Sequence, residues 1–140
     1  MSALKPLHFA AGLIGLIAFV LTGQYMSIFL HGMAGIADGP RLLYRSSHLY
    51  LMWSALVNLL VGVYFTPAET RGARLAQAIS SLFLLAGLPL ILAGFFIESP
   101  ADNLSRWYSG MANYLALAGV LSHVLASHKA AHQGTPQGLQ

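Results

Sequence analysis

Four histidines lie close to the ends of long apolar stretches, and imidazole offers the widest chemistry among the side chains present. His8 opens the first stretch, and His123 lies about one turn before the end of the fourth. His31 ends the first stretch and His48 begins the second. Imidazole ligates haem iron and other transition metals, and it also relays protons. If successive stretches alternate in direction, His8 and His123 lie at similar depth near one end, and His31 and His48 lie near the other.

Two histidine pairs at opposite ends of four helices resemble the layout of membrane b-type cytochromes. In that family, neutral imidazoles from facing helices ligate haem, and electrons pass between the two faces. The resemblance implies haem b as cofactor, with His8, His123, His31 and His48 as ligands. The fourth stretch departs from the cytochrome b561-like pattern, because it offers His123 and no second histidine at its opposite end. An alternative is that these rings simply lie at the membrane interface, where an amphipathic ring is comfortable.

Other metal chemistry is also open. His31, Asp38 and His48 carry nitrogen and oxygen donors suited to copper or zinc. Cysteine is absent, which excludes thiolate metal sites, disulfides and cysteine nucleophiles. The zinc-protease, phosphate-loop, nucleophile-elbow and dinucleotide motifs do not occur in the sequence either. No residue can therefore be assigned a catalytic role.

Hydroxyl and amide side chains form a second polar group within the apolar stretches. Ser54 and Asn58 share one face of the second stretch, and Asn113 and Tyr114 lie in the fourth. Polar groups in lipid are costly, and they commonly form hydrogen bonds between helices or line a solute path. Both interpretations remain open: interhelical hydrogen bonds, or a cavity lined by these four residues.

Four long apolar stretches must position these side chains. A helix needs about 20 apolar residues to cross the hydrocarbon core. Stretches of that kind cover approximately residues 7–30, 46–65, 75–97 and 108–127. All Asp, Glu, Lys and Arg residues lie outside them. We predict an all-α integral membrane protein, in which residues 1–132 form a bundle of four transmembrane helices (two helical hairpins with short loops) and residues 133–140 form a flexible polar tail.

The composition supports a membrane location. Of the 140 residues, 56% are hydrophobic and only 8% are charged, whereas soluble domains carry about 25% charged residues. A soluble fold of this size could not cover so much apolar surface. The net charge of +3 is dispersed, and without a basic stripe it excludes a nucleic-acid partner. The lipid bilayer is the predicted surrounding.

The distribution of basic residues gives a small bias in orientation. Four lie on the side of the termini and the second connection, namely Lys5, Arg71, Arg74 and Lys129. Three lie on the opposite side, namely Arg41, Arg45 and Arg106. The positive-inside rule then predicts that both termini are cytoplasmic, in a bacterial inner membrane.

Three functions are compatible with these observations. The leading prediction is a non-catalytic scaffold, as a homo-oligomer or a subunit of a membrane complex. This function needs the fewest assumptions, because the polar side chains then only join helices. The second is a haem-dependent electron carrier that uses the histidine pairs. The third is a channel or transporter for a small solute.

Overall fold

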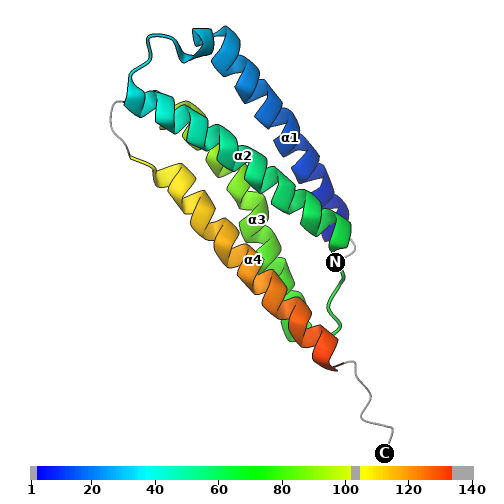
Figure 1. The fold of residues 1–140 in the computed structure, drawn as a ribbon. Helices are drawn as coiled ribbons and strands as arrows, with labels where there is room; N and C mark the ends of the chain where they lie inside the picture. The colour runs from blue at the N-terminus through cyan, green and yellow to red at the C-terminus, as the bar shows by residue number, and fades with distance from the viewer. Residues whose placement is uncertain (1–2, 102–104, 134–140) are drawn as a thin grey trace, which may run out of the picture.

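The chain folds into four long helices and one short 3₁₀ turn (Figure 1). The computed structural model describes residues 3–101 and 105–133, with side chains of the second segment described up to residue 125. The elements are α1 (Leu4–Ile28), η1 (His31–Met33), α2 (Asp38–Tyr64), α3 (Arg71–Ile97) and α4 (Trp107–Gln133). The predicted all-helical architecture is confirmed. The predicted tail falls, apart from its first residue, outside the described residues.

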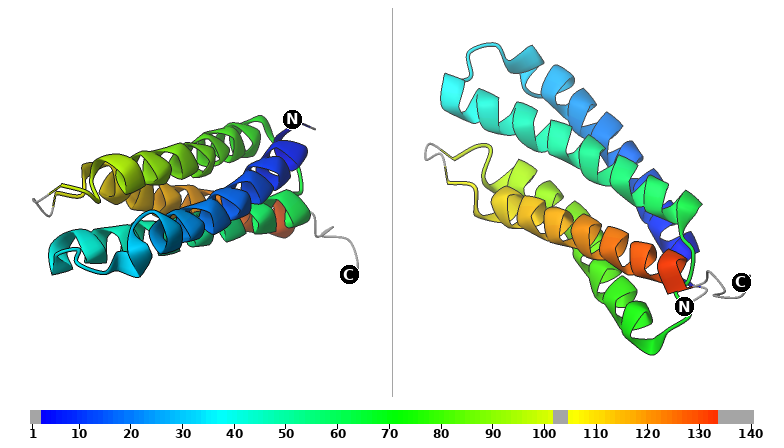
Figure 2. Two further views of the ribbon diagram at one scale, coloured as in Figure 1. Left: turned by 90° about the horizontal axis from the view of Figure 1, so that it is seen from above. Right: turned by 60° about the horizontal axis from the view of Figure 1, so that its bottom comes forward.

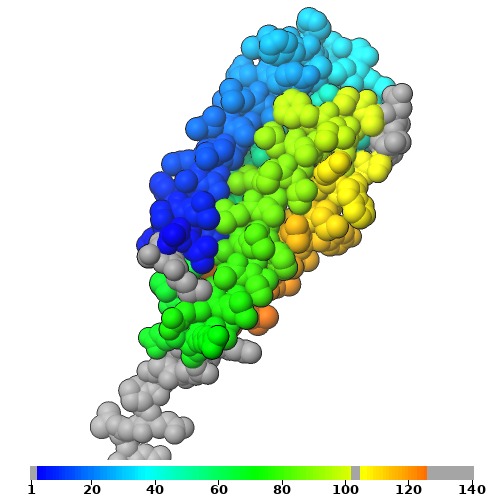
Figure 3. All heavy atoms as spheres, turned by 180° about the vertical axis from the view of Figure 1, so that it is seen from behind, coloured from blue at the N-terminus to red at the C-terminus, as the bar shows by residue number. Residues whose placement is uncertain are grey.

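The helices form two antiparallel hairpins. α1 packs along α2, and α3 packs along α4, while α2 and α3 make the main contact between the hairpins. Seen from behind, α3 runs between α1 and α4 (Figure 3). The start of α1, the end of α4 and the α2–α3 connection share one end of the bundle, which we call the terminal end (Figure 2). The α1–α2 and α3–α4 connections lie at the other, the connection end.

Three helices, α1, α2 and α3, are long and apolar enough to cross a membrane. This supports the predicted membrane location. α4 does not meet the same criterion over its described residues, although it is 27 residues long. Its apolar run is interrupted by polar side chains, including Asn113, Tyr114 and His123. The structure therefore establishes three candidate spans, and the fourth belongs to the proposal below.

The second helix begins earlier than the sequence suggests. The residues from His31 to Arg45 read as a connection because they contain three glycines and Pro40, yet α2 starts at Asp38. Pro40 falls in the first turn of that helix, where its missing N–H costs no intrahelical hydrogen bond. Asp38 also stabilises this turn, because a negative charge is favourable at a helix N-terminus.

Close contact between α1 and α2 depends on glycine. A Cβ atom on Gly62 would lie 2.5 Å from the backbone nitrogen of Phe9, and one on Gly12 would lie 2.8 Å from the backbone nitrogen of Leu59. Backbone atoms cannot move aside as a flexible side chain can. Small residues at such contacts are the usual way in which helices associate in lipid. This seam fixes the depth of His8 relative to α2.

Candidate functional site

The most buried polar contact in the bundle joins His8 of α1 to Asn58 of α2. Both side chains have no solvent exposure, and His8 Nδ1 lies 2.7 Å from Asn58 Oδ1. The amide nitrogen of Asn58 donates to the carbonyl of Ser54, at 2.9 Å, and to the carbonyl of Leu84 on α3, at 3.2 Å. A single amide therefore connects three helices.

This network determines where the His8 proton lies. The Asn58 amide nitrogen faces two carbonyls, which only accept hydrogen bonds, so the oxygen of the amide must face His8. The ring must then donate from Nδ1. In the neutral imidazole, Nε2 consequently carries a lone pair. That nitrogen is buried and has no hydrogen-bond partner among the described residues.

His123 of α4 is the second titratable group in this part of the interior. It lies close enough to His8 for the two imidazoles to interact electrostatically. Its ring centroid is 5.7 Å from that of Phe65, the residue after α2. The pair that the sequence places at one end of the bundle thus lies in one region, where all four helices contribute. A buried imidazole with a bare nitrogen, in the same part of the interior as a second imidazole, offers a basic nitrogen for a proton or a metal ligand.

His48 occupies the other half of the bundle. Its Nδ1 lies 2.9 Å from Thr22 Oγ1, and its ring stacks on Phe19 with centroids 4.1 Å apart. Because the Thr22 hydroxyl donates its proton to the Phe19 carbonyl, it must accept from His48 Nδ1. His48 is half-buried, and both its hydrogen bond and its ring stacking are with residues of α1.

The remaining predicted ligands lie apart from this ring. His31 is exposed in the η1 turn, and Asp38 is exposed and pairs with Arg41 at 3.2 Å. His48, by contrast, points toward α1. Among the residues that the structure describes, no group of three His, Asp or Glu side chains is placed to hold a metal ion. The copper or zinc alternative therefore gains no support from the geometry.

The four residues predicted to line a solute cavity divide between two places. Ser54 and Asn58 are buried in the packed interior. Asn113 and Tyr114 instead line a groove of about 330 Å³, together with Tyr50, Arg106 and Gly110. Ser54 and Asn58 are not among the residues that line this groove.

Several buried polar residues carry no prediction from the sequence, and Glu98 and Gln77 are two of them. Glu98, which follows α3, accepts hydrogen bonds from the backbone N–H of Tyr108, from the backbone N–H of Ser109 at 3.2 Å, and from the Ser109 hydroxyl at 2.8 Å. This carboxylate caps α4, where negative charge is favourable. Gln77 binds the α2–α3 connection, because its amide contacts Ala68 N at 2.9 Å and Thr66 O at 2.8 Å.

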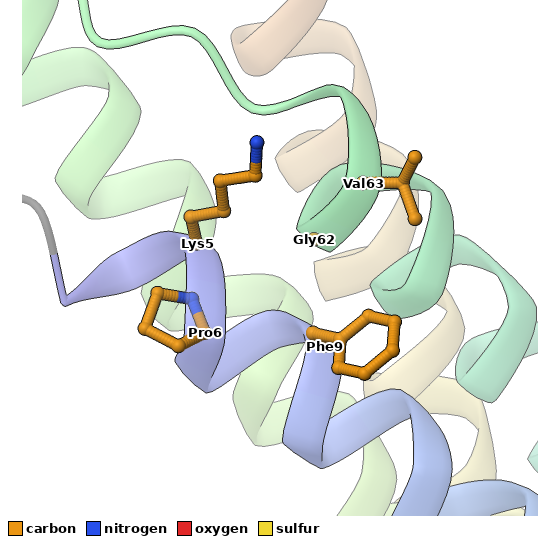
Figure 4. Close-up of a pocket in the computed structure, with 5 residues that line it drawn as sticks. All are labelled: Lys5, Pro6, Phe9, Gly62 and Val63. Carbon is orange, nitrogen blue, oxygen red and sulfur yellow. The ribbon is translucent and has the colours of Figure 1, made fainter.

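A hollow on the outer surface of the terminal end lies over the α1–α2 seam (Figure 4). Its volume is about 490 Å³, and it is lined by Lys5, Pro6, Phe9, Gly62 and Val63. The Lys5 ammonium is the only charged group in that lining. The hollow is open and apolar, which is what a lipid-facing groove between two helices presents.

Comparison with known proteins adds no relative: no family model, curated protein or solved structure matches this chain.

Proposed function

We propose that this protein is a four-span membrane scaffold, acting without catalysis as a homo-oligomer or as a subunit of a membrane complex. The proposal includes α4 as the fourth span, because this helix is 27 residues long and packs along α3. We also propose that the bundle lies in a bacterial inner membrane with both termini in the cytoplasm, because the side of the termini carries four basic residues and the other side three.

The observation that supports this proposal is that three buried polar side chains, those of Asn58, Thr22 and Glu98, form hydrogen bonds between helices. Asn58 connects α1, α2 and α3, and Thr22 connects α1 to α2 through His48. Glu98 connects α3 to α4. Interhelical hydrogen bonds of this kind stabilise membrane bundles. Groups committed to such bonds are not available to bind and turn over a substrate.

The face proposed for assembly lies on α1. This helix is the least buried of the three candidate spans. Its outward face presents Ile14, Ile17 and Leu21, which are 65%, 60% and 62% exposed. A second copy or a partner helix could pack there as closely as lipid does.

Disulfide trapping tests this assembly directly, because the chain has no cysteine of its own. Ile17→Cys on α1 should give a cross-linked species in native membranes under mild oxidation. The matched control is Leu82→Cys, on the exposed face of α3, which should cross-link far less. Equal cross-linking of both variants would contradict the proposal. So would the absence of cross-linking in both variants, if the protein extracted in membrane-derived polymer discs also contained only single chains.

A second candidate is a b-type haem electron carrier, which the bare Nε2 of His8 specifically favours. That nitrogen would be the first ligand and His123 the second, with Asn58 orienting His8 as partners of metal-bound histidines usually do. Haem iron would supply one-electron transfer. The proposed His31–His48 site has no comparable support, because His31 is exposed in η1.

An absorption spectrum of protein expressed with ample haem distinguishes the two candidates. Haem binding predicts a Soret band that shifts on dithionite reduction and is lost in His8→Leu. The scaffold proposal predicts a featureless visible spectrum for both proteins.

A further inference from the structure

The groove at the connection end is built around one guanidinium. Arg106 immediately precedes α4, and the groove runs between this helix and α2, which approach each other only loosely (Figure 1). Its lining combines that guanidinium with the Asn113 amide and the phenols of Tyr50 and Tyr114. A lining of this kind differs from the apolar hollow at the terminal end.

Contacts with α2 hold the Arg106 side chain in place. Its Nη2 donates to Ser46 Oγ at 2.7 Å, and Ser46 in turn donates to the carbonyl of Leu43. The guanidinium carbon lies 5.1 Å from the centre of the Tyr50 ring, a cation–π contact. Among the residues that the structure describes, these contacts use one of the five N–H donors of Arg106, which leaves the others for a ligand.

Within the described part of the chain, Arg106 has no carboxylate partner. The one ion pair found there joins Arg41 to Asp38, and Glu98 is bound to the start of α4. The positive charge is therefore not neutralised by these residues. A planar guanidinium with free donors matches a phosphate oxygen pair better than it matches any neutral group.

We propose that this groove binds the phosphate group of an anionic phospholipid. The proposal rests on the proposed membrane location but not on the scaffold role. Arg106 contacts the phosphate, and Asn113 and Tyr114, about two turns farther along α4, contact the glycerol ester groups that join the phosphate to the acyl chains. Farther along α4, the exposed side chains of Leu117 and Leu121 provide an apolar path for an acyl chain. Trp107, which is 68% exposed, is suited to the headgroup level beside it.

Native mass spectrometry of the detergent-purified protein tests the site. Wild-type protein should retain phosphatidylglycerol in preference to phosphatidylcholine when the two are offered equally. Arg106→Gln should lower phosphatidylglycerol retention roughly tenfold, because a charge-assisted contact is lost. The matched control is Arg45→Gln. It removes an exposed charge from the first half of α2, at the same end of the bundle as Arg106, and should leave retention unchanged.

Two further arms keep the test decisive. Asn113→Leu removes a polar contact from the groove and leaves the charge of Arg106 in place, so it should also lower retention while the protein remains folded. Equal losses in Arg106→Gln and Arg45→Gln would show a general charge effect and overturn the proposal. Binding of inorganic phosphate alone, as tight as that of phosphatidylglycerol, would overturn the lipid assignment.

Discussion

Two histidines, one on α1 and one on α2, are held in the same way in different surroundings. His8 and His48 each bind through Nδ1 to a polar side chain of the neighbouring helix, an amide in one case and a hydroxyl in the other. His8 is fully buried, and its partner Asn58 reaches a third helix. His48 is half-buried, and its bond with Thr22 concerns α1 and α2 only.

The difference in burial should make the hydrogen bond of His8 more important for stability than that of His48. A polar group in a dry interior must be bonded, and breaking its bond leaves an unpaired group behind. A half-buried ring can reorient toward the membrane surface instead. We expect substitutions in the His8 region to cost more than matched substitutions in the His48 region.

The largest effect should come from the glycines at which α1 and α2 meet in these two regions. Gly62→Ala places a Cβ atom 2.5 Å from the backbone of Phe9, which must move α1 away from α2 and separate His8 from Asn58. We expect a loss of about 3 kcal/mol in the free energy of unfolding, the upper end of overpacking costs.

The matched change is Gly23→Ala, whose Cβ would lie 3.2 Å from the side chain of His48. That ring can shift by a few tenths of an ångström, so about 1 kcal/mol is expected. Unfolding by SDS in mixed micelles, followed by circular dichroism, measures both. A larger loss for Gly23→Ala would reverse the comparison.

Asn58→Leu should have the next largest effect. The substitution keeps a similar volume but removes the hydrogen bonds to His8 and to the Leu84 carbonyl, so buried groups lose their partners. We expect a loss of about 2 kcal/mol, within the range for unsatisfied buried polar groups. The same SDS titration measures it, and a loss no greater than that of Thr22→Val would contradict the distinction between the two regions.

Glu98→Gln addresses a different kind of polar contact at the connection end. The amide keeps the shape of the side chain but loses the negative charge and one acceptor at the start of α4. A cap of this kind contributes about 1 kcal/mol. Amide hydrogen exchange should accelerate in the first turn of α4 and remain unchanged in α1.

Thr22→Val should have the smallest effect. It removes the hydroxyl that accepts from His48 and preserves the volume. The expected loss is about 0.6 kcal/mol, the average for hydrogen bonds between membrane helices. Stacking on Phe19 should keep the ring in place, so the histidine side-chain signals in NMR spectra should shift only locally.

The sequence predicts the helices well and the contacts between them poorly. Segregation of charge from long apolar stretches indicates the all-helical fold, and alternating direction puts His8 and His123 at one end. The partner of His8 lies fifty residues away, and it depends on how α1 and α2 are aligned along the seam of Gly12 and Gly62. The capping role of Glu98 is equally hidden, since it depends on the closeness of two helix ends. Both contacts depend on how the helices are aligned along one another, and the pattern of residues in the sequence does not give that alignment.

A double-mutant cycle between His8 and Asn58 tests the central claim most directly, namely that these residues stabilise the bundle through one shared contact. His8→Leu, Asn58→Leu and the double variant would be compared with wild type by SDS unfolding. We predict a coupling free energy of at least about 1 kcal/mol. Losses that add to within about 0.3 kcal/mol would show that the two side chains act independently, and would contradict the account.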